Sequence, residues 1–138
     1  MKNILNDEIC EKLCEAAKEK ANELNIDISF AINDNTGLPL LFRRFGDAPV
    51  ISCTLVPAKA YTSAVMFMTT EELAKLCSDG GPLMGLQNND SKITLISGGY
   101  PLFAQGKCLG GIGVGGGRGN EDNVIAEHVL TVFHELIN

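Results

Sequence analysis

The apolar residues of the first third of the chain change their spacing once, where a helix gives way to a strand. Over residues 9–24 they recur every three or four positions, which predicts an amphipathic helix. Asn6 or Asp7 can cap the start of this helix, and Asn25 suits a left-handed stop. Over residues 26–33 apolar and polar residues alternate, which predicts a half-buried strand.

The next segment predicts a hairpin followed by a helix that contains a proline. Asp34-Asn35-Thr36-Gly37 is a turn sequence, because Asn and Gly accept positive φ, and residues 38–45 return as a second strand. A second helical stretch runs to about Met68. Since a proline inside a helix removes one backbone hydrogen bond, we expect Pro57 to kink this helix or to delay its regular part until Val56.

Residues 69–114 predict a short helix and three strands. Thr70 precedes two glutamates, which is typical of a helix start, and this helix runs through Leu76. Apolar runs then predict strands, the last two of which join through a tight turn at Gln105-Gly106. The predicted strands are residues 93–96, 100–105 and 108–114.

A last helix follows, with Asn120 as its expected cap and two acidic residues in its first turn. The order of elements is a helix, two strands, two helices, three strands and a helix. This order predicts an α+β fold in which helices flank an antiparallel sheet of five strands. Since the chain shows neither a linker nor a repeat, we expect a single domain, residues 1–138.

Composition narrows the class of protein. The net charge of −6, from 17 acidic and 11 basic residues, argues against a surface that neutralises nucleic-acid phosphates. No apolar stretch reaches the ~18–20 residues of a transmembrane helix, and the early acidic residues differ from a secretory signal. We therefore expect a cytoplasmic protein with no nucleic-acid or membrane partner. Its five cysteines are then reduced thiols.

The most unusual segment is residues 110–119, in which seven of ten positions are glycine. Residues 111–116 match G-x-G-x-x-G, but the chain ends in the helix that follows, so the second strand of a dinucleotide-binding unit is missing. Glu121 and Asp122 would also repel a pyrophosphate. The glycines instead suggest a backbone that approaches another surface closely, either a ligand or a subunit.

Other candidate side chains carry weaker signals. Cys10 and Cys14 lie four apart on one helical face but lack further metal ligands, so small core residues are the favoured interpretation. His128 and His134 lie on different faces of the last helix, and His128 borders the apolar face. The chain contains no signature of a catalytic triad or a carboxylate pair, and no catalytic residue is predicted.

One basic grouping stands out in an acidic chain. Arg43-Arg44 ends the second predicted strand, and Lys59 lies on the helix that follows. The fold could bring these cations together to bind a carboxylate. The alternative is a pair of solvated charges and one structural ion pair.

From residue 34 onward the chain resembles the GlcG/HbpS-like family, which includes the C-terminal domain of the PduO adenosyltransferases. The resemblance rests on the hairpin turn, on Arg44 with Asp47-Ala48, and on three longer motifs. These motifs are Lys59-Ala60-Tyr61-Thr62-Ser63-Ala64, Gly98-Gly99-Tyr100-Pro101 and residues 110–126. The family implies profilin-like α-β-α layers with five antiparallel strands, long terminal helices and a homo-oligomer.

The resemblance also implies a ligand class and a binding site. Relatives suggest haem or a corrinoid in the cytosol, in some cases beside diol metabolism and its microcompartments. Arg44 and Lys59 would pair with ligand carboxylates such as haem propionates, and any axial ligand would be His128, a cysteine or a methionine. The predicted ligand-binding residues are Arg44, Lys59, Thr62, Gly98, Gly99, Tyr100, Pro101, Gly113 and Gly115.

Three functions are compatible with these observations. The first is an oligomeric accessory protein that binds a small ligand, with haem or a corrinoid preferred. The second is a non-catalytic assembly subunit of a partner enzyme of diol, glycerol or glycolate metabolism, in which the glycines serve subunit packing. An enzyme acting on haem, a hydroxy acid or an aldehyde is the third, and no residue pattern supports its chemistry.

Overall fold

A computed structural model describes residues 3–118 and 120–138, which form four α-helices, one 3-10 turn and four strands. The helices are α1 (Asp7–Glu23), α2 (Ser52–Met66), α3 (Thr70–Leu76) and α4 (Glu121–Ile137), with the 3-10 turn η1 (Leu86–Asn88). The strands are β1 (Ser29–Asp34), β2 (Pro39–Arg44), β3 (Gly99–Ala104) and β4 (Lys107–Gly115). Among these residues no helix is long and apolar enough to cross a membrane.

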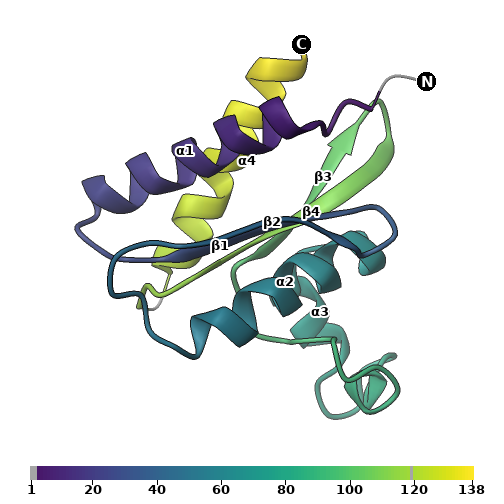
Figure 1. Ribbon diagram of the computed structural model, residues 1–138. Coiled ribbons are helices and arrows are strands. Elements are labelled where there is room, and N and C mark those ends of the chain that lie inside the picture. Colours follow the sequence, from purple (N-terminus) through teal and green to yellow (C-terminus); the bar gives the residue numbers. More distant parts are fainter. Residues whose placement is uncertain (1–2, 119) are drawn as a thin grey trace.

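The elements build three layers, with the sheet in the middle (Figure 1). All strand pairs are antiparallel, and the order across the sheet is β2-β1-β4-β3. The two long terminal helices α1 and α4 cover one face, and α2 and α3 cover the other. The predicted α+β class, with helices flanking an antiparallel sheet, is therefore confirmed.

The main apolar core lies between the sheet and the terminal helices. Phe30 of β1 and Ile112 of β4 point into it, and Leu13 of α1 and Phe133 of α4 close it from above. All four side chains are fully buried. Burial of each stabilises the fold by roughly 1.5–3 kcal/mol before conformational entropy is counted.

The opposite face of β4 carries almost no side chains where α2 crosses it. Gly111 and Gly113 pair with Asn33 and Ala31 of β1, so all four face α2. A Cβ on Gly111 would lie 2.6 Å from the carbonyl oxygen of Ala60. The glycine stretch therefore lets α2 pack on the strand backbone to backbone, and the surface that the strand approaches is a helix of the same chain.

The predicted strand at residues 93–96 is wrong, and the described sheet has four strands rather than five. Ile93 is buried against Leu73 of α3. Thr94 donates its backbone N–H to Oγ1 of Thr62 at 2.9 Å, a bond to α2 and not to a neighbouring strand. Ile93 and Leu95 of this run pack in the cluster that contains Leu73 of α3, whereas Ile96 is exposed.

Local signals at the first helix and the first hairpin are confirmed. Asn6 caps α1 by accepting the N–H of Ile9 at 3.0 Å, and Asn25 adopts the left-handed conformation with φ 57°. The hairpin β1–β2 turns at the predicted sequence, and Gly37 there has φ 86°. The turn at Gln105-Gly106 has positive φ at both residues.

Two predicted helix starts are displaced. Regular α2 begins at Ser52, upstream of Val56, and runs through Pro57. Its first turn is held because Oγ of Ser52 donates to the carbonyl of Pro49 at 2.6 Å. The cap of α3 is Thr69, which forms a reciprocal capping box with the glutamate three residues later.

Candidate functional site

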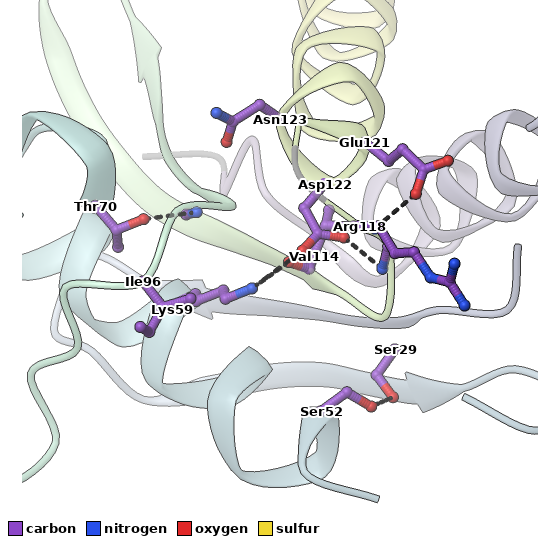
Figure 2. Close-up of polar contacts among 12 residues, drawn as sticks. Ser29, Ser52, Lys59, Thr70, Ile96, Val114, Arg118, Glu121, Asp122 and Asn123 are labelled. Carbon is purple, nitrogen blue, oxygen red and sulfur yellow. Dashed lines mark hydrogen bonds and ion pairs between the residues drawn. The ribbon is translucent and has the colours of Figure 1, made fainter. Parts of the chain in front are cut away.

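A buried lysine joins three elements at one end of the sheet. Lys59 of α2 is 2% exposed. Its Nζ donates to the carbonyl of Val114 in β4 at 2.8 Å and lies 3.5 Å from Oδ2 of Asp122 in α4 (Figure 2). A buried ammonium is costly unless it is paired, and here both a carbonyl and a carboxylate pair it.

Asp122 owes its position to the loop that precedes α4. Its Oδ1 accepts the backbone N–H of Gly117 at 2.9 Å, and Glu121 accepts that of Arg118 at 2.6 Å. The cap bond predicted for the side chain of Asn120 is absent. The two first-turn carboxylates instead accept N–H groups of the loop that precedes the helix. The glycine-rich loop thus fixes the acid that faces Lys59.

The environment of Lys59 favours the neutral amine more than water does. Burial lowers the pKa of Lys59, and the charge of Asp122 and its hydrogen bond oppose that shift only in part. A deprotonated amine is a nucleophile, which a solvent-exposed lysine at neutral pH almost never provides.

Lys59 and Asp122 border a hollow of about 210 Å³ between α2 and the loop after β4. Its rim is apolar, and two rim side chains are exposed: Ile51 at 61% and Ile96 at 51%. The lining consists of Pro49, Ile51, Ser52, Leu55, Lys59, Ile96, Gly115, Gly116, Gly117 and Asp122. An apolar rim around a few polar groups is the usual composition of a small-molecule site.

Two of the predicted glycines lie close to the amine, where a side chain would collide with its surroundings. A Cβ on Gly98 would lie 3.0 Å from Nζ of Lys59, and one on Gly115 would lie 3.3 Å from it. Gly98 also has φ 117°, a conformation that side chains disfavour. The structure therefore brings Lys59, Gly98 and Gly115 of the predicted set together.

Arg44 does not join this group. Its Nε and Nη2 both donate to the carbonyl of Ala48, at 2.9 and 2.7 Å, which braces the loop after β2. Arg44 is absent from the lining of the hollow that contains Lys59. The two predicted cations thus have different partners, and Lys59 forms the structural ion pair that was the alternative interpretation.

The remaining predicted residues serve contacts within the chain. Thr62 is buried on α2 and accepts the N–H of Thr94. Tyr100 donates its hydroxyl to Glu127 of α4 at 3.3 Å, and burial, with help from Glu127, raises the pKa of Tyr100 to about 12.

Gly99, Gly113 and Pro101 belong to the surface under α2. Gly99 and Pro101 of β3 pair with glycines of β4. A Cβ on Gly99 would lie 2.6 Å from the carbonyl of Lys59, and one on Gly113 would meet the backbone of Val56 and Ala60. At Gly99 and Gly113 the space beside the backbone is therefore occupied by α2.

Neither histidine lies at the hollow. His128 is half-buried on α4, and His134 near its end lines another hollow with Phe103. The described residues contain no group of three or more His, Cys, Asp or Glu side chains that could hold a metal ion. Gly119, part of the motif at residues 110–126, lies outside the described residues.

Sequence reasoning missed Asp122 as the partner of Lys59. Both residues stand beside motifs that had been singled out, but their separation of 63 positions hides the contact. A usable signal was the single lysine at the start of an otherwise small and apolar helical motif, because a lysine on a buried face needs a carboxylate.

Comparison with known proteins settles the family. Residues 5–131 match the family model described as "Haem degrading protein HbpS-like". The chain belongs to the HbpS-like family. This confirms the resemblance that the sequence motifs carried.

Relatives of this HbpS-like protein differ in length. It is 37% identical over 126 residues to the "Uncharacterized 15.0 kDa protein in dhaT-dhaS intergenic region" of Citrobacter freundii, covering 91% of this chain and 89% of that one. It is 34% identical to "Corrinoid adenosyltransferase PduO" of the same organism, covering 89% of this chain but only 37% of PduO.

A solved structure, "Crystal Structure of PduOC:Heme Complex", matches this HbpS-like protein with a TM-score of 0.88 and 32% identity. The match covers 92% of this chain and 93% of that one.

Proposed function

We propose that this HbpS-like protein is a cytoplasmic, oligomeric haem-binding protein. The observation that carries the proposal is the close structural match to a relative solved as a haem complex. The description of the family as haem-degrading supports the same ligand class. Haem is therefore preferred to a corrinoid.

The hollow beside Lys59 does not suit haem. Its volume of about 210 Å³ is below the ~300–1,000 Å³ typical of ligand pockets. Its cation is already neutralised by Asp122, so a propionate would gain little there and would face a carboxylate.

Two hollows at the end of the sheet opposite Lys59 fit haem better. A hollow of about 400 Å³ lies between the N-terminal segment and the two hairpin turns, and a second hollow of about 250 Å³ adjoins it and shares Ile4. Leu40 and Leu109 give the first an apolar lining, Lys107 offers a cation, and His134 lines the second. An imidazole can ligate haem iron, and a lysine can pair with a propionate.

Both hollows are open to solvent at this end of the chain, so haem would be only partly covered by one protomer. A second copy would complete the cover, which is why the proposal includes an oligomer. Asp34 also lines the larger hollow, but its carboxylate is occupied by N–H groups of the hairpin turn.

Haem titration tests the proposal. We expect a sharp Soret band and one haem per one or two chains by native mass spectrometry. His134→Ala should shift that band and weaken binding at least about tenfold, the loss of roughly 1.4 kcal/mol. His128→Ala and Arg44→Ala are the matched controls for the two residues predicted from sequence. Unchanged affinity in His134→Ala, or no binding by the native protein, would overturn the site or the function respectively.

An assembly role is the second candidate, and one observation favours it. β2 is an edge strand that exposes the apolar side chains of Leu40 and Phe42, both at 40%, and Leu38 just before it is 63% exposed. An exposed apolar edge is a site for pairing with another chain. An oligomer that ignores haem would favour this role.

A further inference from the structure

We propose that the hollow beside Lys59 is a second ligand site, which takes a short neutral aldehyde or ketone and holds it as an imine on Nζ of Lys59. The proposal does not rest on haem binding, because the two sites lie at opposite ends of the sheet. It rests on three features of the hollow: a buried amine, a paired carboxylate and an apolar rim of limited size.

The amine is held at the floor of the hollow with one donor position unassigned. Lys59 has three N–H donors, and Val114 and Asp122 accept two of them. Gly115 and Lys59 both line this hollow. A Cβ on Gly115 would approach Nζ to 3.3 Å, so a larger residue at this position would crowd the amine.

The charge of the Lys59–Asp122 pair and the volume of the hollow limit which ligands fit. The Lys59–Asp122 pair is neutral as a unit, and Asp122 would repel an oxo acid, so an uncharged carbonyl compound fits best. A volume of about 210 Å³ corresponds to roughly seven water molecules at ~30 Å³ each, which is room for a chain of a few carbons. Ile51, Leu55 and Ile96 would contact that aliphatic chain.

The chemistry balances with the groups present. Asp122 accepts a proton from the ammonium of Lys59, and the freed amine adds to the carbonyl carbon, forming the C–N bond. A proton moves from nitrogen to the former carbonyl oxygen, giving a carbinolamine. Asp122 then returns its proton to this hydroxyl, the C–O bond breaks and water leaves. The product is an iminium ion, which keeps the ion pair with Asp122.

Reductive trapping tests the site. The native protein is incubated with a low concentration of butanal, reduced with borohydride, and mapped by peptide mass spectrometry. We expect one butyl adduct per chain at Lys59, formed faster than at the exposed lysines Lys12 and Lys75. The direction follows because burial lowers the pKa of Lys59, which raises its neutral fraction, and because the apolar rim holds the aldehyde beside the amine.

Blocking the rim separates the site from general lysine reactivity without removing the buried charge. Ile96→Trp should fill the mouth of the hollow and suppress the Lys59 adduct, while Leu38→Trp, an exposed position on the hairpin, should leave it unchanged. Pyruvate should label Lys59 less than butanal does. Labelling of Lys59 no faster than of Lys75, or undiminished labelling in Ile96→Trp, would overturn the proposal. Haem titration of Ile96→Trp should match the native protein, so the two proposals fail independently.

Discussion

Replacement of Gly113 by alanine tests why the glycine stretch exists. If α2 rests on the backbone of β4, the added methyl group has no space. If the glycines instead form a wall for a ligand, the methyl would meet only an empty surface in the free protein. The two explanations therefore differ in the free energy of unfolding without any ligand present.

The contacts at Gly113 set the size of the expected loss of stability. The new Cβ would lie 2.9 Å from the backbone N of Ala60 and closer still to the carbonyl oxygen of Val56. Ordinary contact begins near 3.4 Å, so α2 would have to move away by about 1 Å. Overpacking costs typically 1–3 kcal/mol, and this collision is at the upper end because backbone atoms have no rotamer to change. Alanine also lowers the conformational entropy of the unfolded chain, which stabilises the folded state by about 0.4–1 kcal/mol. We expect a net loss of about 2 kcal/mol.

Urea unfolding of Gly113→Ala measures this loss directly, provided that the m-value is unchanged. Gly106→Ala is the matched control, because no described atom lies within 4 Å of its Cβ position. Its φ of 77° makes conformational strain of about 1 kcal/mol the only cost. A Gly113→Ala protein that is as stable as Gly106→Ala would refute packing against α2 as the reason for the glycine.

Four further outcomes are expected for other parts of the chain. Burial raises the pKa of Cys10 and of Cys14 from 9.0 to about 11, so iodoacetamide at pH 8 should alkylate the exposed Cys53 first, as read by peptide mapping. The folded state then binds more protons than the unfolded state between pH 9 and 11, and stability in urea should fall as the pH rises through that window. Phe42→Glu places a charge on the exposed edge β2 and should lower the mass of any assembly in light scattering without changing the circular dichroism; an unchanged mass would exclude this edge as the interface. Thr69→Ala removes the capping box of α3 and should cost about 0.5–2 kcal/mol in thermal or urea unfolding, whereas Thr36→Ala, in the hairpin turn, should leave α3 intact.

The parts of the fold that were predicted correctly are those in which contacts between residues close in sequence determine the conformation. The turn of the hairpin β1–β2 has a sequence that tolerates positive φ, and Gly37 adopts such a φ there. The alternating pattern correctly predicted a strand, but β1 is buried at five of its six positions and is not the half-buried strand that was expected. The start of α1 at Asn6 is likewise a contact between residues three apart. In such segments, propensity and tertiary packing favour the same conformation.

The secondary structure was predicted wrongly where a residue distant in the sequence determines the local conformation. The apolar run at residues 93–96 matches a strand, but its backbone N–H at Thr94 finds the hydroxyl of Thr62 instead of a neighbouring strand. The regular part of α2 extends upstream of Pro57 because the packing of Val56 and the bond of Ser52 to Pro49 outweigh one missing helical bond. Neither partner is visible in a short window.

Of the residues predicted to bind a ligand, some lie together in the structure and others do not. Lys59, Gly98 and Gly115 were singled out and do meet, but Gly99 and Gly113 face α2, and Arg44 holds its own loop. A glycine-rich motif signals close approach without saying whether the neighbour is a ligand or a helix. Only the register of β4 against β1 separates the two cases.

The charge state of Lys59 can be measured through its partner. Asp122→Asn keeps Oδ1 and thus the bond from Gly117, but removes the negative charge that faces Nζ at 3.5 Å. If Lys59 is an ammonium, this substitution leaves a buried unpaired cation, which costs about 3–5 kcal/mol. We expect about 3 kcal/mol in urea unfolding at pH 7, because the carboxylate side chain is 13% exposed and water relieves part of the penalty. Lys59→Met combined with Asp122→Asn should recover most of the loss, since neither charge remains. The penalty should also shrink as the pH rises, because the folded pKa of Lys59 is lowered and the native amine loses its proton before the unfolded one does. A loss below about 1 kcal/mol at pH 7 with no pH dependence would show that no ammonium needs Asp122, and the lysine would then be neutral already in the resting protein.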